Sequence, residues 1–389
     1  MTEKVKLNEI TDIYLGVTHT PEYVLDGVPF LSVKDISGGK ICFDECKFIS
    51  QKEYNSLSEG AKPKVGDMLF CRVGTIGKPI IIPEGTPLFG SFVSLGYLRN
   101  KAKDRCNLNY LRYWMYSNSF WKQVNKNVKG ASQVNLNTGW LSNFEITLPD
   151  FSEQTYIVSI LDKCKLIIER REEELKKFDN LIKARFVEMF GSIYNNEYGY
   201  NIKTLQDVCE PIKDGTHQTP TYTENMEKGF KFLSSKDVVS GKIDWSKVRY
   251  IPKELHEELY SRIKPQRGDL LLAKNGTTGV AAIVETDEVF DIYVSLAILR
   301  PFDINSVYLW GAVNSMDTKR QFDGALKGIG VPNLHLGEIK KTKIVVPPIQ
   351  IQAEFEQFVY QVNKSKVEVQ KALDKAQLLF DSLMQKYFE

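Results

Sequence analysis

Apolar residues recur at alternating spacings of four and three between Glu153 and Phe190, a stretch that contains no Gly or Pro. The positions that carry this pattern are Ile157, Leu161, Cys164, Ile168, Leu175, Phe178, Ile182 and Met189. A heptad pattern of this kind places one apolar seam along a helix that packs against another helix. At 1.5 Å per residue, about 36 residues predict a helix about 54 Å long, and Gly191 provides a stop after it.

A second seam runs through the last part of the chain. Its apolar positions are Phe355, Val359, Val362, Val369, Leu373, Ala376, Phe380, Met384 and Tyr387. The two seams differ at one layer, because Ile168 and Arg171 of the first are matched by Lys366 and Val369 of the second. They therefore predict two similar helices that are not interchangeable, and their remaining charges form a solvated face.

The remainder of the chain has short apolar and β-branched runs separated by Gly, Pro, Asn and Asp. Lys78–Ile82 and Ser91–Leu98 are runs that predict strands, and Asn109–Asn118 predicts a helix. The fold class predicted for the chain is therefore α+β, with mixed α/β domains next to long helices. The second such domain is expected to open near Ile202.

The chain also contains an internal repeat. FLSVKDISGGKI at 30–41 and FLSSKDVVSGKI at 232–243 share eight of twelve residues at an offset of 202. At the same offset, PKVGDMLFCRVGTIG at 63–77 matches PQRGDLLLAKNGTTG at 265–279. Further along, the offset becomes 198 and aligns Asn135 with Asn333. A register held over this length indicates a duplicated domain followed by a duplicated helix.

From the repeat and the seams we predict four segments. They are a first domain at 1–152, a helical spacer at 153–195, a second domain at 196–350 and a second helical spacer at 351–389. The repetition predicts a pseudo-twofold particle in which the two helices run antiparallel as a coiled coil and hold the domains apart. Two similar domains at a fixed separation suit a long, repetitive ligand such as duplex DNA, which advances about 3.4 Å per base pair.

Composition narrows the class of protein. The 389 residues include 51 basic and 49 acidic side chains, so the formal charge of +2 predicts neither a globally basic nucleic-acid binder nor an acidic disordered chain. Six cysteines at irregular spacings and four histidines give no zinc or disulfide pattern, so no metal is expected. The sequence lacks a signal-peptide pattern and any apolar run long enough to cross a bilayer. We therefore expect a cytoplasmic protein without membrane contact.

A local basic surface is indicated between Arg105 and Phe144, where forty residues include no Asp or Glu. The basic residues there are Arg105, Arg112, Lys122, Lys126 and Lys129, interleaved with Asn, Gln and Trp. Basic side chains contact phosphates and amides can read base edges, so this composition favours DNA binding; the alternative is an acid-poor helix and loop that arose by chance. The matching stretch of the second copy carries Asp317 and Asp323. This difference predicts that the two domains do not read the same sequence.

The two repeated turns at 74–77 (GTIG) and 276–279 (GTTG) have two interpretations. Glycine permits positive φ and close approach of a partner. The turns are therefore either DNA-facing loops, with Arg72, Lys274 and Asn275 beside them, or tight turns kept for strand geometry. They are not phosphate loops for ATP, because Arg72 stands where such a loop needs its first Gly and Pro79 where it needs Ser or Thr.

The chain contains no complete enzymatic motif. An adenine methyltransferase needs a cofactor-binding segment and an Asn or Asp-Pro-Pro-aromatic segment, whereas Pro347-Pro348 is followed by Ile349. A metal-dependent nuclease built on Asp150 and Glu174 fails because Glu174 lies about 30 Å along the predicted helix. We therefore expect no catalytic activity in this chain.

Several of the repeated segments carry a resemblance to a known family. They are THTPEY at 18–23 and GTHQTPTY at 215–222, FLSVKDI and FLSSKDV, GDMLFCRVGTIG and GDLLLAKNGTTG, and the helix starts LPDFSEQ and VPPIQIQ. Over its whole length the chain resembles the specificity subunit of type I restriction-modification systems. The second helix start departs from the family pattern, with Ile351-Gln352 where the first has Glu153-Gln154, so the acid at that position carries no weight.

The resemblance implies a set of roles and partners. Two target recognition domains would each read one half of a bipartite site in double-stranded DNA, and the helices would set the spacing between the halves. The helices would also dock two methyltransferase subunits that use S-adenosylmethionine. Restriction subunits, the motor and nuclease that use ATP and Mg²⁺, would join them. This chain itself would have no cofactor and no catalytic residues.

The residues predicted to contact DNA are basic, amide and imidazole side chains of the repeated segments and the basic stretch. They are Lys34, Arg72, Lys126, Lys129, Gln133 and Asn135 in the first domain and Lys236, Lys274, Asn275, Lys327, Asn333 and His335 in the second. The alternative function is a non-enzymatic scaffold or adaptor with two heads on a coiled coil. Such a protein would show no steep loss of DNA affinity with added salt.

Overall fold

The computed structural model describes residues 2–74, 76–127, 135–276, 278–326 and 332–389. These residues form two units, the first made of Met1–Glu172 with Lys371–Glu389 and the second of Glu173–Gln370. Each unit therefore combines one copy of the repeat with part of both long helices. The predicted segment boundaries at 152, 195 and 350 and the pseudo-twofold relation stay predictions.

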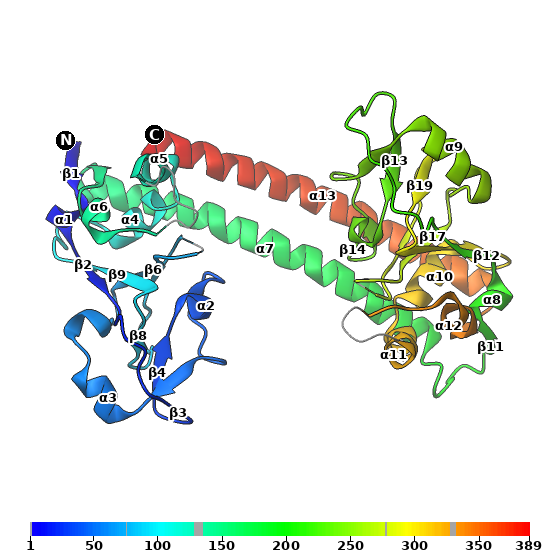
Figure 1. Cartoon of the computed structure of the whole chain (residues 1–389), viewed down its shortest axis with the longest axis horizontal. Coiled ribbons are helices and arrows are strands. Elements are labelled where there is room, and N and C mark those ends of the chain that lie inside the picture. Colours follow the sequence, from blue (N-terminus) through cyan, green and yellow to red (C-terminus); the bar gives the residue numbers. More distant parts are fainter. Residues whose placement is uncertain (1, 75, 128–134, 277, 327–331) are drawn as a thin grey trace. The chain divides into compact units, whose positions relative to one another are not determined.

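The two heptad seams form two helices of 40 residues, α7 (Phe151–Phe190) and α13 (Ile349–Phe388) (Figure 1). In unit 1, the first part of α7 shares a hydrophobic cluster with the last part of α13. In unit 2, the last part of α7 meets the first part of α13, with the rings of Phe186 and Phe355 5.4 Å apart. The pairing within each unit is therefore antiparallel, as predicted. Lys366, which stands in the second seam where the first has Ile168, is nearly buried and pairs with Asp179 of α7. This ion pair accounts for a charged residue in the seam.

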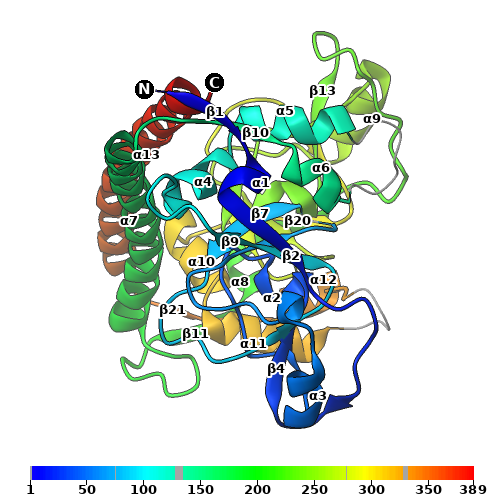
Figure 2. The same ribbon diagram turned by 90° about the vertical axis from the view of Figure 1, so that its left-hand side faces the viewer.

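Unit 1 begins with a strand and alternates short strands with short helices before α7. Its elements are β1 (Glu3–Lys6), α1 (Leu7–Ile10), β2 (Thr11–Leu15), β3 (Tyr23–Val24), β4 (Val28–Leu31), α2 (Val33–Ile36), β5 (Lys47–Ile49), α3 (Gln51–Ser56), the 3-10 helix η1 (Glu59–Ala61), β6 (Met68–Cys71), β7 (Gly77–Ile81), β8 (Gly90–Ser91), β9 (Leu95–Asn100), α4 (Leu108–Trp114), α5 (Asn118–Asn127), α6 (Thr138–Ser142) and β10 (Glu145–Leu148). Figure 2 shows β1 leading through α1 into β2, with β9 beside it.

Unit 2 repeats this order after α7. Its elements are β11 (Asn201–Thr204), α8 (Leu205–Val208), β12 (Cys209–Asp214), β13 (Phe230–Leu233), the 3-10 helix η2 (Ser235–Asp237), β14 (Val238–Val239), β15 (Lys242–Ile243), β16 (Arg249–Ile251), α9 (Lys253–Arg262), β17 (Leu270–Ala273), β18 (Ala281–Ile283), β19 (Phe290–Ile292), β20 (Leu296–Pro301), α10 (Ser306–Val313), α11 (Met316–Ala325), α12 (Leu336–Lys341) and β21 (Lys343–Val346). The first strand after α7, β11, contains Ile202, the residue near which the second domain was expected to open.

The four-stranded sheets and the two-stranded terminal pairs of the two units correspond strand for strand, whereas the smaller sheets differ. A four-stranded sheet has the order β2-β9-β6-β7 in unit 1 and β12-β20-β17-β18 in unit 2. A two-stranded pair, β1 with β10 or β11 with β21, lies next to the start of a long helix in the sequence. A smaller sheet is β3-β5-β4-β8 in unit 1 and β16-β13-β19 in unit 2, where β14 and β15 form a separate pair. The two copies therefore share one α+β fold.

The strand that follows each Gly-Asp pair forms the centre of its unit. All four residues of β6 are buried, with Met68 and Phe70 in one hydrophobic cluster and Leu69 and Cys71 in another. Strand β17 repeats this division between two clusters. Because successive side chains of a strand point to opposite faces, a run that is apolar at every position indicates a sheet covered on both sides.

Two local predictions differ from the structure. The run Ser91–Leu98 is not one strand, because β8 ends at Ser91 and β9 begins at Leu95 with a turn between them. The helix expected at Asn109–Asn118 is α4, which ends at Trp114, and α5 begins at Asn118. In both places a short turn interrupts a continuous apolar pattern. Within the described ranges, no helix combines the length and the apolar character that a bilayer crossing needs.

Candidate nucleic-acid interface

The motifs of the first repeat meet at one edge of unit 1. The backbone N–H of Val33 donates to Ser94 Oγ at 3.3 Å, and the N–H of Arg72 donates to Ser94 O at 2.9 Å. The N–H of Leu136 in turn donates to Arg72 O at 2.9 Å. Segments 32–36, 72–74, 92–95 and 135–136 are thereby joined, and we call them the motif edge of unit 1.

Unit 2 repeats these bonds. The N–H of Ser235 donates to Ser295 Oγ at 2.9 Å, the N–H of Lys274 to Ser295 O at 2.8 Å, and the N–H of Leu334 to Lys274 O at 3.0 Å. Segments 234–237, 274–276, 293–296 and 333–335 form the motif edge of unit 2. The structure thus brings together sequence motifs that are up to about a hundred residues apart, and does so twice.

The FLSVKD and FLSSKD motifs form capped turns. The backbone N–H of Ser32 donates to Asp35 at 2.6 Å, and that of Ser234 donates to Asp237 at 2.7 Å. A side-chain acceptor at this position satisfies a donor at the start of a helical turn and fixes the turn. The lysines between cap and acid, Lys34 and Lys236, are exposed, although Lys34 Nζ also donates to Glu45 O at 3.3 Å.

Arg72 and Lys274 occupy equivalent positions and both bond to internal acceptors. Arg72 Nε donates to Leu136 O at 3.0 Å and Nη1 donates to Val93 O at 3.2 Å. Lys274 is 5% exposed and its ammonium group pairs with Asp214. These contacts make both cations braces of the motif edge and argue against a direct phosphate contact by Lys274, whose charge Asp214 already neutralises. Their contribution to DNA binding stays a prediction.

The asparagines of the motif edges lie in a repeated backbone bridge. Asn135 is bridged to Val73 in unit 1, and Asn333 is bridged to Asn275 in unit 2. The side-chain Oδ1 of Asn275 is buried and has no hydrogen-bond partner within the described ranges. His335 is exposed at the start of α12 and makes no cap bond to it. Asn135 therefore lies in the motif edge of unit 1. Asn275, Asn333 and His335 lie in the motif edge of unit 2.

The glycines of the GTIG and GTTG segments make tight turns between strands. Gly74 and Gly276 have φ of +73° and +75°, and Gly77 and Gly279 both have φ of +84°. Only glycine adopts this region without strain. A Cβ on Gly279 would also approach Phe322 Cδ2 to 3.1 Å. Strand geometry therefore accounts for the repeated glycines, and the DNA-facing interpretation remains a prediction.

The basic stretch 105–144 is divided among several roles. Arg105 pairs with Glu3 at 2.9 Å and Arg112 pairs with Asp162 at 3.1 Å, so these two cations are already neutralised. Lys122 and Lys126 are exposed on α5. The predicted contacts Lys129, Gln133 and Lys327 lie outside the described residues.

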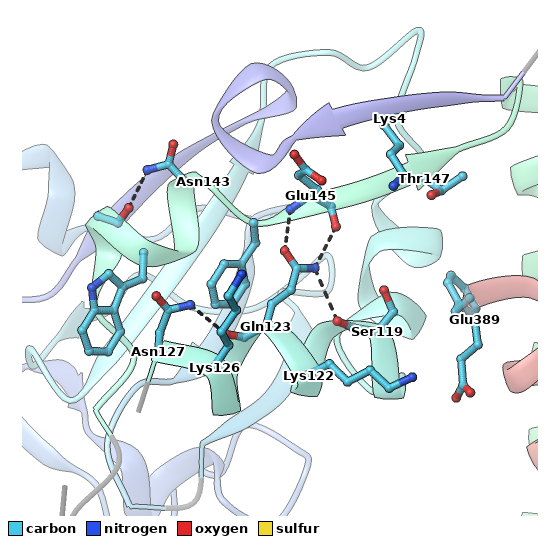
Figure 3. A pocket seen from close by; sticks show the side chains of 14 residues that line it. Lys4, Ser119, Lys122, Gln123, Lys126, Asn127, Asn143, Glu145, Thr147 and Glu389 are labelled. Atoms are coloured by element: carbon cyan, nitrogen blue, oxygen red, sulfur yellow. Dashed lines mark hydrogen bonds between the residues drawn. The ribbon is translucent and has the colours of Figure 1, made fainter. Parts of the chain in front are cut away.

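Lys126 also lines a cavity of about 790 Å³ in unit 1 that we call the α5 pocket. Its lining residues are Lys4, Ser119, Lys122, Gln123, Lys126, Asn127, Gly139, Trp140, Asn143, Phe144, Glu145, Thr147, Phe388 and Glu389. In Figure 3, Lys122 and Lys126 extend from α5, and Lys4 comes from β1. Lys126 therefore belongs to a different surface feature from Lys34 and Asn135.

Two pairs of supporting residues were missing from the prediction. Arg99 Nε and Nη2 donate to the carboxylate of Asp67 at 2.9 and 2.7 Å, and Arg300 donates to Asp269 at 2.8 and 2.9 Å. This hydrogen bond raises the pKa of each arginine further above its ordinary value, although burial opposes it. Each acid is the Asp of the repeated Gly-Asp pair, and its presence in both copies was the signal.

Repeated glutamines were also missing from the prediction. Gln123 Nε2 donates to Glu145 O at 2.9 Å and its Oε1 accepts from the Glu145 N–H at 2.8 Å, and Gln321 makes the same two bonds with Lys343. Gln154 and Gln352, at the starts of the long helices, accept from the N–H of Asn107 and Asn305 and donate to Pro149 O and Pro347 O. The glutamine of each helix start thus has a structural role that does not need the preceding acid.

A family model described as "Type I restriction modification DNA specificity domain" matches the chain twice, at residues 2–177 and 197–378. The type I restriction enzyme MjaVIII specificity subunit of Methanocaldococcus jannaschii is 23% identical over 273 residues, which are 64% of this chain and 63% of that relative. The chain therefore spans less than two thirds of that relative's length. The MjaIX specificity subunit of the same organism is 22% identical over 417 residues, 98% of this chain and 91% of the relative.

Two solved structures share the fold over the full length of the chain. One, described as the structural basis underlying complex assembly and conformational transition of the type I R-M system, has a TM-score of 0.61 at 17% identity and covers 100% of this chain and 97% of that chain. The other, the type I restriction-modification system S subunit from M. genitalium, has a TM-score of 0.55 at 14% identity and covers 100% and 96%. At these identities the two structures support the fold alone.

Proposed function

Because the chain belongs to the type I restriction modification DNA specificity domain family, whose model matches each of its repeats, we propose that it is the DNA sequence-specificity subunit of a type I restriction-modification complex. Each unit reads one half of an asymmetric bipartite site in duplex DNA. The observation that carries this proposal is the double match, because two copies of one specificity domain in one chain require two recognised stretches. The chain is a recognition component and performs no chemistry.

Each motif edge supplies the chemistry that reading a duplex needs. Lys34 and Lys236 are exposed on capped turns that fix their backbones, which suits contacts to phosphates. Asn135, Asn275 and Asn333 carry amides that can pair with base edges. Arg72 and Lys274 act indirectly, by holding these segments in place.

The partners follow from the type of complex. Two methyltransferase subunits dock on the long helices, bind S-adenosylmethionine and flip the target adenine out of the duplex. Restriction subunits that use ATP and Mg²⁺ join the same assembly. The helices set the spacing between the two half-sites, and this chain holds no cofactor of its own.

The salt dependence of DNA affinity tests this proposal against the adaptor alternative. The chain is combined with its methyltransferase subunits, and the affinity for a labelled duplex is measured by fluorescence anisotropy over a series of salt concentrations. Contact with several phosphates predicts that log K falls with log salt with a slope on the order of −4 or steeper. A slope near zero would favour the two-headed adaptor.

A further inference from the structure

The α5 pocket is a concave, lysine-rich surface of unit 1 outside the motif edge. Its lysines come from β1 (Lys4) and from α5 (Lys122 and Lys126), and Trp140 of α6 lies 40% exposed beside them (Figure 3). The side-chain amide of Gln123 is already used by the backbone of Glu145. Within the described ranges, none of the three lysines forms an ion pair.

Unit 2 shows what the equivalent surface binds. Helix α11 takes the place of α5 there, and Gln321 repeats the bonds of Gln123. An irregular segment at 191–200 connects α7 to β11, and its residues 191–194 lie against this surface. The hydroxyl of Ser192 and the N–H of Ile193 both donate to Asp317 Oδ2 at 2.8 Å. The same architectural surface therefore accepts a stretch of polypeptide in unit 2.

The covering segment also fills the space. Ile193 packs against the hydrophobic core of unit 2, and Arg320 lies over the ring of Tyr194 at 5.9 Å. The cavity that remains beside Asp317 and Arg320 is about 240 Å³, compared with about 790 Å³ for the α5 pocket. The α5 pocket is therefore the uncovered counterpart of a surface that binds polypeptide elsewhere in the chain.

The residues that line the two surfaces differ in charge. At the offset of 198, Asp317 of unit 2 corresponds to Ser119, Gly324 to Lys126 and Ile202 to Lys4, whereas Arg320 corresponds to Lys122. The acid that accepts two donors of the covering segment is thus lost in unit 1 and two lysines are gained. Glu145 and Glu389 also line the α5 pocket, but neither pairs with these lysines. The three lysines outnumber these two acids, so an anionic ligand complements the α5 pocket.

We propose that the α5 pocket binds an acidic, extended polypeptide segment of a partner subunit, in the place that residues 191–194 take in unit 2. This inference rests on the proposed function, because the partner is a subunit of the restriction-modification complex. Its carboxylates pair with Lys4, Lys122 and Lys126, which are exposed at the pocket. Polypeptide is favoured over DNA because the repeat binds polypeptide here.

Photo-crosslinking in the assembled complex tests the proposal. Thr147, an exposed residue of β10 that lines the pocket, is changed to p-benzoylphenylalanine, and the complex with methyltransferase subunits and DNA is irradiated. The expected product joins this chain to a partner subunit through a peptide rich in Asp or Glu. A matched chain with the same group at Arg320, on the covered surface of unit 2, is expected to give no such product.

Charge variants complete the test. The double variant Lys4→Glu, Lys122→Glu is expected to lower the crosslink yield by about tenfold or more, whereas Lys4→Arg, Lys122→Arg retains it. A crosslink to DNA or within this chain, or equal yields from both variants, would overturn the proposal. Methylation by the same preparation is measured separately. A complex that methylates DNA without the crosslink refutes this inference alone, whereas a chain that binds no partner subunit and supports no methylation refutes the proposed function as well.

Discussion

The motif edges of the two units share a backbone and differ in the acceptors that hold one cation. In unit 1, Arg72 donates to the carbonyl groups of Val93 and Leu136, whereas in unit 2 the equivalent Lys274 pairs with the carboxylate of Asp214. Leu15 stands at the place of Asp214 in unit 1, since Gly16 and Gly215 make the same bond to the next strand. Unit 1 therefore keeps a positive charge at its edge that unit 2 neutralises.

This difference in side chains occurs on a backbone framework that is the same in both copies. The capped turns, the bonds to Ser94 and Ser295 and the pairs of Asp67 and Asp269 with arginine are the same in both copies. The side chains placed on this scaffold have diverged. Such a division suits two domains that present the same segments to a duplex and read different sequences from it.

The buried carboxylates at the starts of β6 and β17 are expected to give the largest effect. Asp67→Ala and Asp269→Ala each leave an arginine without its bidentate partner, so each should lower the free energy of unfolding of its own unit by about 3 kcal/mol. Hydrogen exchange measured peptide by peptide during urea unfolding assigns the loss to a unit. A large loss from one of the two variants with no loss from the other would contradict the shared scaffold.

The ion pair that only unit 2 has should give the next largest effect. Asp214→Leu leaves Lys274 buried without an anion and is expected to cost about 2 kcal/mol of unfolding free energy. The double variant Asp214→Leu, Lys274→Met should recover most of this loss, because an apolar pair of similar volume often replaces a buried ion pair at little cost. A double variant less stable than Asp214→Leu would show that the ion pair of Asp214 with Lys274 does not stabilise the motif edge of unit 2.

Unit 2 also has a carboxyl group that makes its stability depend on pH. Burial raises the pKa of Asp291 to about 6, although the hydrogen bond from His256 opposes the shift. Gly90 and Tyr54 take these two places in unit 1. The folded state favours the protonated form of Asp291. The stabilisation that this carboxyl group contributes is therefore fully present below about pH 4 and is lost as the pH rises through about 6.

Comparison with Asp291→Asn isolates this contribution. Between pH 4 and pH 7 the unfolding free energy of unit 2 is expected to fall by roughly 1–2 kcal/mol relative to the variant, as measured by urea unfolding at each pH. Unit 1 should show no matching change from this position. A stability that rises over this range relative to Asp291→Asn would show that the carboxyl is held charged instead.

The exposed lysines of the capped turns should give the smallest effect. Lys34→Ala and Lys236→Ala are each expected to weaken DNA binding by about threefold to tenfold and to make the salt slope shallower by about 1, at the target site and at unrelated sites alike. Fluorescence anisotropy with both duplexes measures this. Lys40→Ala, an exposed lysine outside the motif edge, is the control. A loss confined to the target site would mean that the lysine reads bases.

Sequence reasoning reached the duplication and the long helices because both are periodic. Phe30 and Phe232 begin the same motif, and the apolar seams need no knowledge of partners distant in sequence. It could not foresee that Lys274 is buried, since its partner Asp214 is 60 residues away and nothing local marks it as buried. Composition alone predicts that basic residues lie on the surface. In the structure, Arg72 donates to a backbone carbonyl group, and Arg105 and Arg112 form surface ion pairs.

The repeat itself held signals that were not used. Gln123 and Gln321 match at the offset of 198, as do Gln154 and Gln352. The two glutamines of each pair make matching backbone hydrogen bonds in the two copies, so identity at these positions points to structure. The reverse also holds, because Leu15 and Asp214, or Ser119 and Asp317, differ at equivalent places. Differences between the copies are therefore the better guide to recognition.

Whether the two units read two different half-sites can be tested by sequencing DNA methylation in cells that express this chain with its methyltransferase subunits. Because the two units differ, we expect methylated adenines in one bipartite motif with two unlike halves and a fixed gap between them. Exchanging the second domain, predicted at 196–350, for that of another specificity subunit should alter one half and leave the other unchanged. No new methylated adenine, or a motif with two identical halves, would contradict it.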